Sequence, residues 1–159
     1  MGKEIERKFL VKDKSYHQLA KGILYQQGYI CSMAGRTVRV RICDEKGFLT
    51  VKSKSIGATR LEYEYEIPLA DAEEMLAFLC EKPIIEKYRY KYEYKGFLWE
   101  IDEFKGENEG LVIAEIELSH EDEAFEKPDW IGSEVTGISR YFNSNLMRSP
   151  YSSWKIENK

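Results

Sequence analysis

Charged residues near the start of the chain are spaced two apart, which suits chemistry on a metal-bound anion. Glu4, Glu6 and Lys8 alternate with the apolar residues Ile5 and Phe9. Alternate side chains of a β-strand share one face, so this segment would present two carboxylates and an ammonium group over an apolar back. Carboxylates about 7 Å apart, two strand rises, can share a hard divalent cation or flank a pair of them. The lysine that follows can hold the anion that the metal attracts.

The same alternation recurs along the chain, and each segment carries charges of mainly one sign. The acidic pairs are Glu4/Glu6, Glu62/Glu64, Glu100/Asp102 and Glu115/Glu117. The basic pairs are Arg39/Arg41, Lys52/Lys54 and Lys87/Arg89, joined by Lys8. One such strand alone is typical of a half-solvated antiparallel sheet. Because like charges along a strand repel one another, the full set instead predicts strands of alternating sign around a shared interior, which holds a polyanion and its metals.

The residue types in this set favour phosphoryl chemistry. Carboxylates suit Mg²⁺ or Mn²⁺, which complete their coordination shells with water and phosphate oxygens. Arg39 and Arg41 can make forked contacts with phosphate, whereas lysines act as point charges, and together they would clamp an extended triphosphate. Phosphoryl transfer mainly requires positioning and charge neutralisation. With a second metal to activate a water, the set predicts a hydrolase that uses two ions.

Other catalytic and metal-binding arrangements are not supported. The chain contains neither a G-x-x-x-x-G-K-[ST] loop nor a G-x-G-x-x-G turn that would cradle phosphate. His17 and His120 fall outside the charged strand faces, as expected of surface or capping histidines. Cys31, Cys43 and Cys80 are odd in number and lack C-x-x-C spacing, which argues against a disulfide framework or a zinc site and favours a reducing cytosol.

The composition predicts a single domain, residues 1–159. A chain of 159 residues with 43% hydrophobic residues is long enough for one proper core. Its net charge of −4 argues against a nucleic-acid partner bound through a broadly basic surface. No apolar run approaches the length of a membrane span, and the charged N-terminus is unlike a signal peptide. We therefore expect a cytoplasmic protein without a membrane partner.

Turn residues divide the chain into segments that must position these charges. The predicted strands are 4–11, 23–33, 37–43, 48–54, 59–67, 84–94, 97–104 and 111–118. A short helix capped by Asp13 or Ser15 should end near Gly22. A longer helix should cover 71–81, and its apolar stripe contains Ala72, Met75, Leu76 and Leu79.

Residues 121–159 are expected to form a helical or irregular cap, with Ser139 as the N-cap of a helix that begins at Arg140. Short turns between about eight strands favour an antiparallel sheet, and closing this sheet into a barrel removes its edges. We therefore predict an α+β fold, an eight-stranded antiparallel β-barrel with flanking helices and a C-terminal helical cap.

These motifs together resemble those of the CYTH, or triphosphate tunnel metalloenzyme, superfamily. Glu4-x-Glu6-x-Lys8 is similar to its ExExK signature. The likeness continues in order through Arg39-x-Arg41, Lys52, Arg60-x-Glu62-x-Glu64, Lys87-x-Arg89, Trp99-Glu100-Ile101-Asp102, Ala114-Glu115-Ile116-Glu117-Leu118 and Glu134-Val135-Thr136-Gly137. The resemblance implies an antiparallel barrel that forms a tunnel around a substrate triphosphate. One departure is Gly137-Ile138-Ser139-Arg140-Tyr141, where relatives often have Gly-Asp-x-Arg-Tyr.

The resemblance also implies a role for each charged residue. The implied metal ligands, for two Mg²⁺ or Mn²⁺ ions, are Glu4, Glu6, Asp102, Glu115 and Glu117. The implied phosphate-binding residues are Lys8, Arg39, Arg41, Lys52, Lys87 and Arg89. The catalytic residues would be Lys8, Asp102 and Glu117. Further residues that would line the tunnel are Lys54, Glu62, Glu64 and Glu100.

Three functions fit this resemblance. The opening MGKEIERKFLV looks most like compact bacterial members that hydrolyse inorganic tripolyphosphate, so we expect a metal-dependent triphosphatase with a small-molecule substrate. An adenylate cyclase on the same scaffold is the alternative enzyme, although we find no base-recognition motif. A non-catalytic sensor of polyphosphate or nucleotide is a third alternative, and the many metal-type carboxylates argue against it. Aromatic residues on exposed strand faces favour a homodimer.

Overall fold

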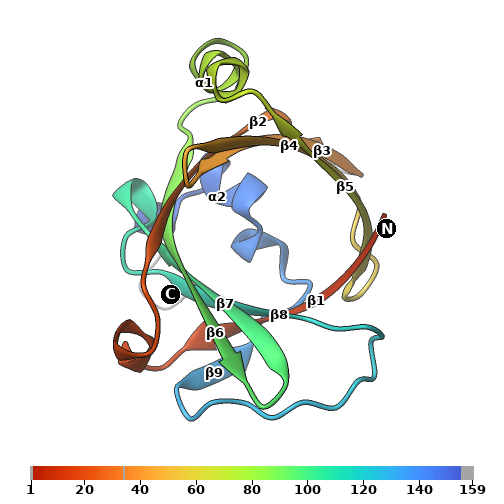
Figure 1. Cartoon of the computed structure of the whole chain (residues 1–159), viewed down its shortest axis with the longest axis vertical. Helices are drawn as coiled ribbons and strands as arrows, with labels where there is room; N and C mark the ends of the chain where they lie inside the picture. The colour runs from red at the N-terminus through yellow and green to blue at the C-terminus, as the bar shows by residue number, and fades with distance from the viewer. Residues whose placement is uncertain (1, 34, 155–159) are drawn as a thin grey trace.

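The computed structural model describes residues 2–33 and 35–154. Met1 and residues 155–159 lie outside the described residues. Both ends of the predicted domain and the end of the predicted cap therefore lie there too. Eight strands form a closed antiparallel barrel (Figure 1). They are β1 (Lys3–Val11), β2 (Ile23–Cys31), β3 (Arg36–Cys43), β4 (Lys46–Ser53), β5 (Thr59–Ile67), β6 (Ile85–Tyr94), β7 (Phe97–Phe104) and β8 (Val112–Glu117). The predicted barrel is confirmed, and its strand boundaries agree within two residues.

Strand β1 closes the barrel and also pairs with a ninth strand. The order around the barrel is β5-β4-β3-β2-β6-β7-β8-β1, and Lys3–Ile5 of β1 pair with β5 to complete it. Further along β1, Phe9 and Val11 pair with β9 (Ile131–Glu134). The prediction of a helical or irregular cap missed β9, because Ile-Gly-Ser-Glu shows no alternation. This strand forms because the edge of β1 is free beyond its pairing with β5.

The main apolar core lies outside the barrel, against the backs of β1, β7 and β8. Phe9 and Trp99 are fully buried, and their ring centroids are 5.6 Å apart. Phe125, in the segment between β8 and β9, packs over both rings with centroid distances of 6.1 and 5.8 Å. The structure thus confirms that Phe9 belongs to the outer face of the barrel, which leaves the inner face for charged residues.

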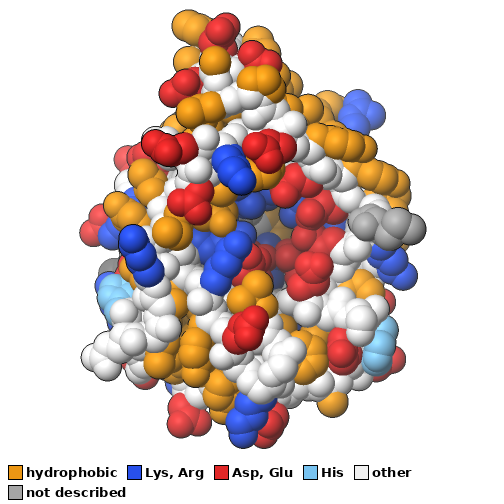
Figure 2. Space-filling view, viewed as in Figure 1, with side chains coloured by type: hydrophobic (Ala, Val, Ile, Leu, Met, Phe, Trp, Pro, Cys, Tyr) orange, Lys and Arg blue, Asp and Glu red, His pale blue; other side chains and the backbone are white. Residues whose placement is uncertain are grey.

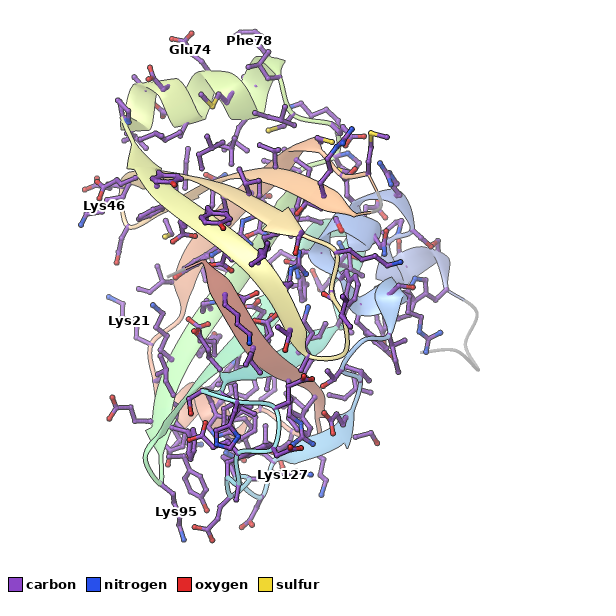
Figure 3. The ribbon with its side chains drawn as sticks, turned by 90° about the vertical axis from the view of Figure 1, so that its right-hand side faces the viewer. Lys21, Lys46, Glu74, Phe78, Lys95 and Lys127 are labelled. Carbon is purple, nitrogen blue, oxygen red and sulfur yellow. The ribbon has the colours of Figure 1, made fainter. Side chains whose placement is uncertain are left out.

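Helix α1 (Leu69–Phe78) covers the outer faces of β3 and β4 (Figure 3). Its residues Ala72 and Leu76 are buried, as predicted. The helix was predicted over 71–81, but it begins and ends earlier. Leu79, predicted on the buried stripe, is instead 61% exposed and lies just after the last helical residue.

The remaining helices are short. The helix predicted after Asp13 is a 3-10 helix, η1 (Ser15–Gln18), and the predicted helix from Arg140 begins instead at Asn143, as α2 (Asn143–Arg148). The extended backbone of Phe142 separates α2 from the 3-10 turn before it. The other 3-10 helices are η2 (Gly106–Asn108), η3 (Ser139–Tyr141) and η4 (Tyr151–Ser153). Within residues 2–33 and 35–154, no helix has the length and apolar character to cross a membrane.

Helix α2 closes one end of the barrel interior (Figures 1 and 3). Its residues Leu146 and Met147 pack in one cluster with Ile85, Phe104 and Ile113 from the strands. Each of these strand residues lies two positions from a charged inward residue, so the same strand face is apolar at this end and charged further along. The interior is therefore a pocket that opens on the side shown in Figure 2.

Replacing Phe9 should test the external core. Because Phe9 is fully buried, we expect Phe9→Ala to lower the free energy of unfolding by about 3–5 kcal/mol through lost burial and a residual cavity. Phe78→Ala is the matched control, since Phe78 is 81% exposed on α1, and its effect should stay within about 0.5 kcal/mol. Urea denaturation monitored by circular dichroism measures both. Equal losses in the two variants would contradict the external core.

Candidate active site

The barrel interior contains a cavity of about 410 Å³ lined mainly by charged side chains. Seen from its mouth, Asp and Glu side chains gather on one side and Lys and Arg side chains on the other (Figure 2). All predicted site residues except Lys54 and Asp102 line this cavity. The predicted residues that line it are Glu4, Glu6, Lys8, Arg39, Arg41, Lys52, Glu62, Glu64, Lys87, Arg89, Glu100, Glu115 and Glu117.

Four carboxylates on β1 and β8, those of Glu4, Glu6, Glu115 and Glu117, form what we term the acidic wall. Glu6 lies opposite Glu117 in the pairing of β1 with β8, and Glu115 lies opposite Glu100 in the pairing of β7 with β8. Carboxylates directly opposite one another repel and destabilise a sheet. Burial and the charge of Glu6 raise the pKa of Glu4 to about 9, and burial and the charge of Glu115 raise the pKa of Glu6 to about 7. Glu4 and Glu6 of the acidic wall therefore retain protons that a bound cation would displace, whereas Glu115 is buried but the charges of Lys8 and Arg89 lower its pKa.

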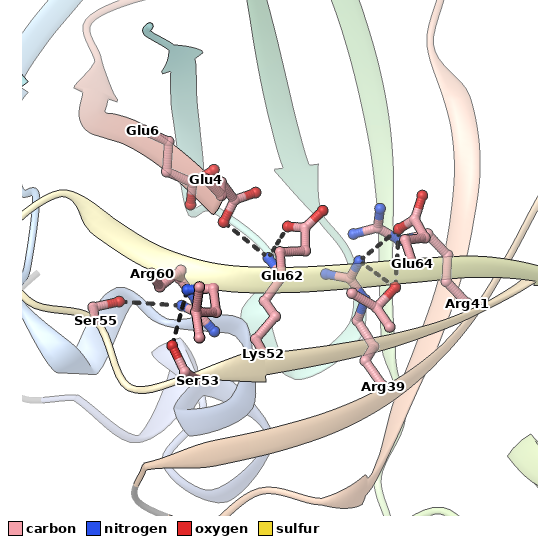
Figure 4. Close-up of polar contacts among 12 residues, drawn as sticks. Glu4, Glu6, Arg39, Arg41, Lys52, Ser53, Ser55, Arg60, Glu62 and Glu64 are labelled. Atoms are coloured by element: carbon pink, nitrogen blue, oxygen red, sulfur yellow. Dashed lines mark hydrogen bonds and ion pairs between the residues drawn. The ribbon is translucent and has the colours of Figure 1, made fainter. Parts of the chain in front are cut away.

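Basic residues contact carboxylates on adjacent strands and across an intervening strand (Figure 4). The Nζ atom of Lys52 lies 3.4 Å from Oε1 of Glu4 and 3.2 Å from Oε2 of Glu62. Burial acts to raise the pKa of Glu62, but a hydrogen bond from Glu4 and the charge of Lys52 lower it to about 2. The proton of the Glu4–Glu62 pair therefore resides on Glu4. In the same way, Nη2 of Arg39 lies 3.4 Å from Oε2 of Glu64.

Four cations on β3 and β6, those of Arg39, Arg41, Lys87 and Arg89, form what we term the basic wall. All four side chains are buried. The ring of Tyr25 lies close to two of them, with its centroid 5.0 Å from Cζ of Arg41 and 4.9 Å from Cζ of Arg89. Burial and repulsion from Arg39 and Arg89 lower the pKa of Arg41 to about 10, and burial lowers the pKa of Lys87 to about 7. The basic wall is thus electrostatically strained, and a bound anion would relieve it.

Asp102 lies behind the basic wall and does not line the cavity. Its Oδ1 accepts a hydrogen bond from Nε of Arg89 at 2.7 Å, and its Oδ2 accepts one from Nζ of Lys87 at 2.7 Å. Burial opposes ionisation, but the two cations hold the pKa of Asp102 below its usual value. This position does not support the predicted metal-ligand and catalytic roles, because both oxygens are already engaged. Asp102 instead holds Lys87 and Arg89 in place.

Lys54 also lies outside the cavity, contrary to the prediction that it lines the tunnel. Strand β4 ends at Ser53, so the alternation that places Lys52 inside does not extend to Lys54, which is exposed.

Arg60 lines the cavity although it was given no role from the sequence. It lies on β5 with the same parity as Glu62, and that spacing could have identified it. Its Nη1 atom donates to Oγ of Ser55 at 3.3 Å (Figure 4), whereas its Nε, like that of Arg39, is buried without a hydrogen-bond partner in the described part of the chain. Two inward arginines therefore have donors left for an anion.

Two neutral residues of the site, Gln27 and Asn143, were also missed. Gln27 is fully buried on β2 and bonds to Arg41, and Asn143 lines the cavity from the first position of α2. The period-two pattern of β2 could have placed Gln27 inside the barrel. No pattern in the sequence places Asn143 there, because it depends on how the C-terminal segment folds back.

The acidic wall suits a hard divalent cation. Its side chains, as they lie, form no group of three or more His, Cys, Asp and Glu residues close enough to chelate one ion, judged over residues 2–33 and 35–154. Mg²⁺ does not require such a cage, since it is usually bound by one or two carboxylates with waters and substrate phosphates. The protonated Glu4 and the repulsion between Glu6 and Glu115, which raises the pKa of Glu6, indicate carboxylates placed for a positive charge.

A closed antiparallel barrel with an acidic wall facing a basic wall defines a class of protein built to enclose a polyanion with metal ions. This chain belongs to the CYTH family, whose domain matches residues 2–151.

Named relatives cover almost the whole chain. An inorganic triphosphatase of Acetivibrio thermocellus is 62% identical over 155 residues, which are 98% of this chain and 99% of the relative. An inorganic triphosphatase of Nitrosomonas europaea is 37% identical over 150 residues, which are 92% of this chain and 97% of the relative. A crystal structure of an inorganic triphosphatase, 35% identical, superposes with a TM-score of 0.63 and covers 91% of this chain and 93% of its own.

Metal binding should release protons from the acidic wall. A raised pKa means that the neutral form of Glu4 persists up to pH of about 9, whereas a cation binds the ionised form. Addition of Mg²⁺ at pH 8 should therefore release protons, and the apparent affinity should rise with pH until Glu4 is ionised. Calorimetry in two buffers of different ionisation enthalpy measures the release, and Glu4→Gln is the control that should reduce it. Binding of Mg²⁺ at pH 8 without proton release would contradict the raised pKa of Glu4.

Removing single charges should distinguish the structural role of Asp102 from that of the acidic wall, through their effects on stability. Asp102→Asn leaves two buried cations short of their counter-charge, so we expect a loss of about 3–5 kcal/mol in the free energy of unfolding. Glu117→Gln removes a repulsive cross-strand charge and should leave the metal-free protein as stable or more stable, by up to about 1 kcal/mol. Denaturant titrations in EDTA measure both. If Asp102→Asn is as stable as the wild type, Asp102 does not hold the basic wall together.

Proposed function

We propose that this protein is a divalent-metal-dependent hydrolase that removes the terminal phosphate of inorganic tripolyphosphate. The observation that carries this proposal is the acidic wall facing the basic wall inside one cavity of about 410 Å³. A linear polyanion with bound cations complements both walls at once. The name inorganic triphosphatase, borne by relatives that are 62% and 37% identical, supports the same activity.

The cations in the cavity bind and orient the substrate phosphates. Arg39 and Arg41 present planar guanidinium groups from β3, suited to forked contacts, whereas β6 presents the ammonium group of Lys87 and the guanidinium group of Arg89. The remaining phosphate-binding lysines are Lys8 and Lys52, on β1 and β4. Contacts from opposite sides of the barrel would hold the chain of phosphates extended. Such positioning accounts for most of what phosphoryl transfer requires of a protein.

Glu4, Glu6, Glu115 and Glu117 would hold one or two Mg²⁺ or Mn²⁺ ions, directly or through water. A bound ion would neutralise charge on the phosphates and lower the pKa of a coordinated water. Asp102 is left out of this set, because its oxygens bind Lys87 and Arg89. Glu117 is half-exposed, and burial with repulsion from Glu62 and Glu100 raises its pKa. Glu117 is therefore placed to accept a proton from an attacking water at the open side.

The closed end of the barrel limits access of water. Helix α2 and its cluster with Ile85 and Ile113 fill that end, so substrate enters through the charged mouth. Charges act more strongly in such an enclosed space, because less water screens them. This supports binding of a small, highly charged substrate.

Location and assembly extend this proposal. Cys31, Cys43 and Cys80 are free thiols, which supports a reducing cytoplasm. Leu61, Tyr63 and Tyr65 are exposed in a row on the outer face of β5, with exposed fractions of 46–60%, which supports a homodimer through this face.

An assay with two substrates tests the activity. With Mg²⁺ or Mn²⁺, we expect phosphate release from tripolyphosphate. This substrate is charged at both ends, so it fits a charged cavity with one open mouth. Cyclic AMP and pyrophosphate from ATP would instead indicate a cyclase, and product from neither substrate would indicate a binding module. Malachite-green detection and chromatography of the nucleotides measure these outcomes.

Two substitutions test the assigned residues. Glu117→Ala and Lys8→Ala should each lower turnover of tripolyphosphate by at least about a hundredfold while the protein stays folded. The matched controls are Glu73→Ala on α1 and Lys54→Ala, whose side chains are exposed away from the cavity and whose removal should leave turnover unchanged. Steady-state kinetics and circular dichroism measure the set. Turnover near wild type in both site variants would remove these residues from the mechanism.

A further inference from the structure

Two neutral amides, the fully buried Gln27 and the partly buried Asn143, link two cations of the basic wall. The Nε atom of Arg41 donates to Oε1 of Gln27 at 2.8 Å, and Nε2 of Gln27 donates to Oδ1 of Asn143 at 2.9 Å. The Nζ atom of Lys87 donates to the same Oδ1 atom at 2.8 Å. Arg41 and Lys87 are thus joined through Gln27 and Asn143 in one continuous chain of hydrogen bonds.

The positions of these residues in the fold explain why a bridge is needed. Arg41 lies on β3 and Lys87 on β6, and β2 separates these strands in the barrel. Gln27 lies on β2 directly opposite Arg41 in the pairing with β3. The two cations have no direct contact through backbone pairing, so their relative position depends on side chains between them. Asn143 supplies the last step from α2, and it lines the cavity itself.

The neutrality of the bridge is as important as its geometry. Asp102 already supplies a buried carboxylate to Lys87 and Arg89. A further carboxylate at the bridge would form ion pairs with Arg41 or Lys87 and compete with a phosphate for them. An amide oxygen orients the same donors and leaves their positive charge available.

We propose that Gln27 and Asn143 are positioning residues for triphosphate binding, which hold Arg41 and Lys87 at one separation and direct both toward the same substrate without neutralising them. This proposal deepens the proposed function and rests on it for the identity of the substrate. Because the bridge ends on α2, it also couples the helix that closes the barrel to the phosphate-binding side chains. Neither residue is assigned contact with the reacting atoms.

The test compares removal of each amide with its conversion to an acid. The variants are Gln27→Ala, Gln27→Glu, Asn143→Ala and Asn143→Asp. The matched controls are Gln26→Ala and Asn145→Ala, since Gln26 bonds outside the cavity to Glu86 at 2.9 Å and Asn145 bonds to the carbonyl oxygen of Ser139 at 2.8 Å. Calorimetric titration with tripolyphosphate in EDTA measures Kd, steady-state kinetics with Mg²⁺ measure KM and kcat, and thermal denaturation measures stability.

We expect the alanine variants to lose about 10- to 100-fold in kcat/KM, mainly through a higher KM, with a matching rise in Kd. The acidic variants should bind more weakly than the alanine variants, although they restore an oxygen acceptor. A packing role alone would lower the melting temperature and leave KM and Kd unchanged, so that result would overturn the proposal. So would a Kd within about twofold of wild type in folded alanine variants, or acidic variants that bind as tightly as wild type.

The design also separates this proposal from the proposed function. A wild-type protein that binds tripolyphosphate in EDTA but does not hydrolyse it with Mg²⁺ would contradict the hydrolase, while the Kd values of the variants would still decide the positioning role. Asn143 lies at the start of a short surface helix and is partly exposed, so its variants decide the question if a substitution at the fully buried Gln27 prevents folding.

Discussion

Repulsion between like charges inside a closed barrel is the constraint on which the rest of this structure depends. Closing the sheet directs the inward side chains of eight strands into one enclosed volume, where charges interact more strongly than in water. Glu6 faces Glu117 across one strand pair, and Glu4 retains its proton to a pKa of about 9. On the other side, burial and neighbouring cations lower the pKa of Lys87 to about 7. Backbone hydrogen bonds of the barrel hold these groups in place, and a metal-bound polyanion is the ligand that would relieve both walls.

A polar interior requires that stability come from elsewhere in the molecule. The core of Phe9 and Trp99 lies on the outside of the barrel, and α1 covers a second apolar face over Val40. The third cluster fills the closed end, where α2 packs against Ile85 and Ile113. The first two clusters therefore occupy the strand faces opposite the site, which alternation along each strand allows, and the third shares the inner face with the site but lies at its closed end. Residues can be specialised for binding charge without loss of the apolar surface that folds the chain.

The site contains residues that line the cavity and residues that support the lining side chains from behind. Asp102 lies on the inward face of its strand, like the cavity residues, yet its carboxylate accepts hydrogen bonds from Lys87 and Arg89. The ring of Tyr25 contacts the guanidinium groups of both Arg41 and Arg89. These supporting groups hold several cations close together, which favours binding of a polyphosphate. The family assignment from residue 2 to residue 151 agrees with this arrangement.

The sequence by itself determined the barrel, the strand boundaries and most of the cavity lining, because alternation at a period of two is a local property of each strand. Alternation placed Glu4, Arg39 and Glu115 on the charged face of their strands, and the full set of such faces predicted that they share one interior. Tertiary structure decided what depends on neighbours. It made Asp102 a partner of Lys87, placed Lys54 beyond the end of its strand, and formed β9 where the edge of β1 was free. It alone brought Asn143 from the C-terminal segment into the cavity, since no periodicity records where an irregular chain folds back.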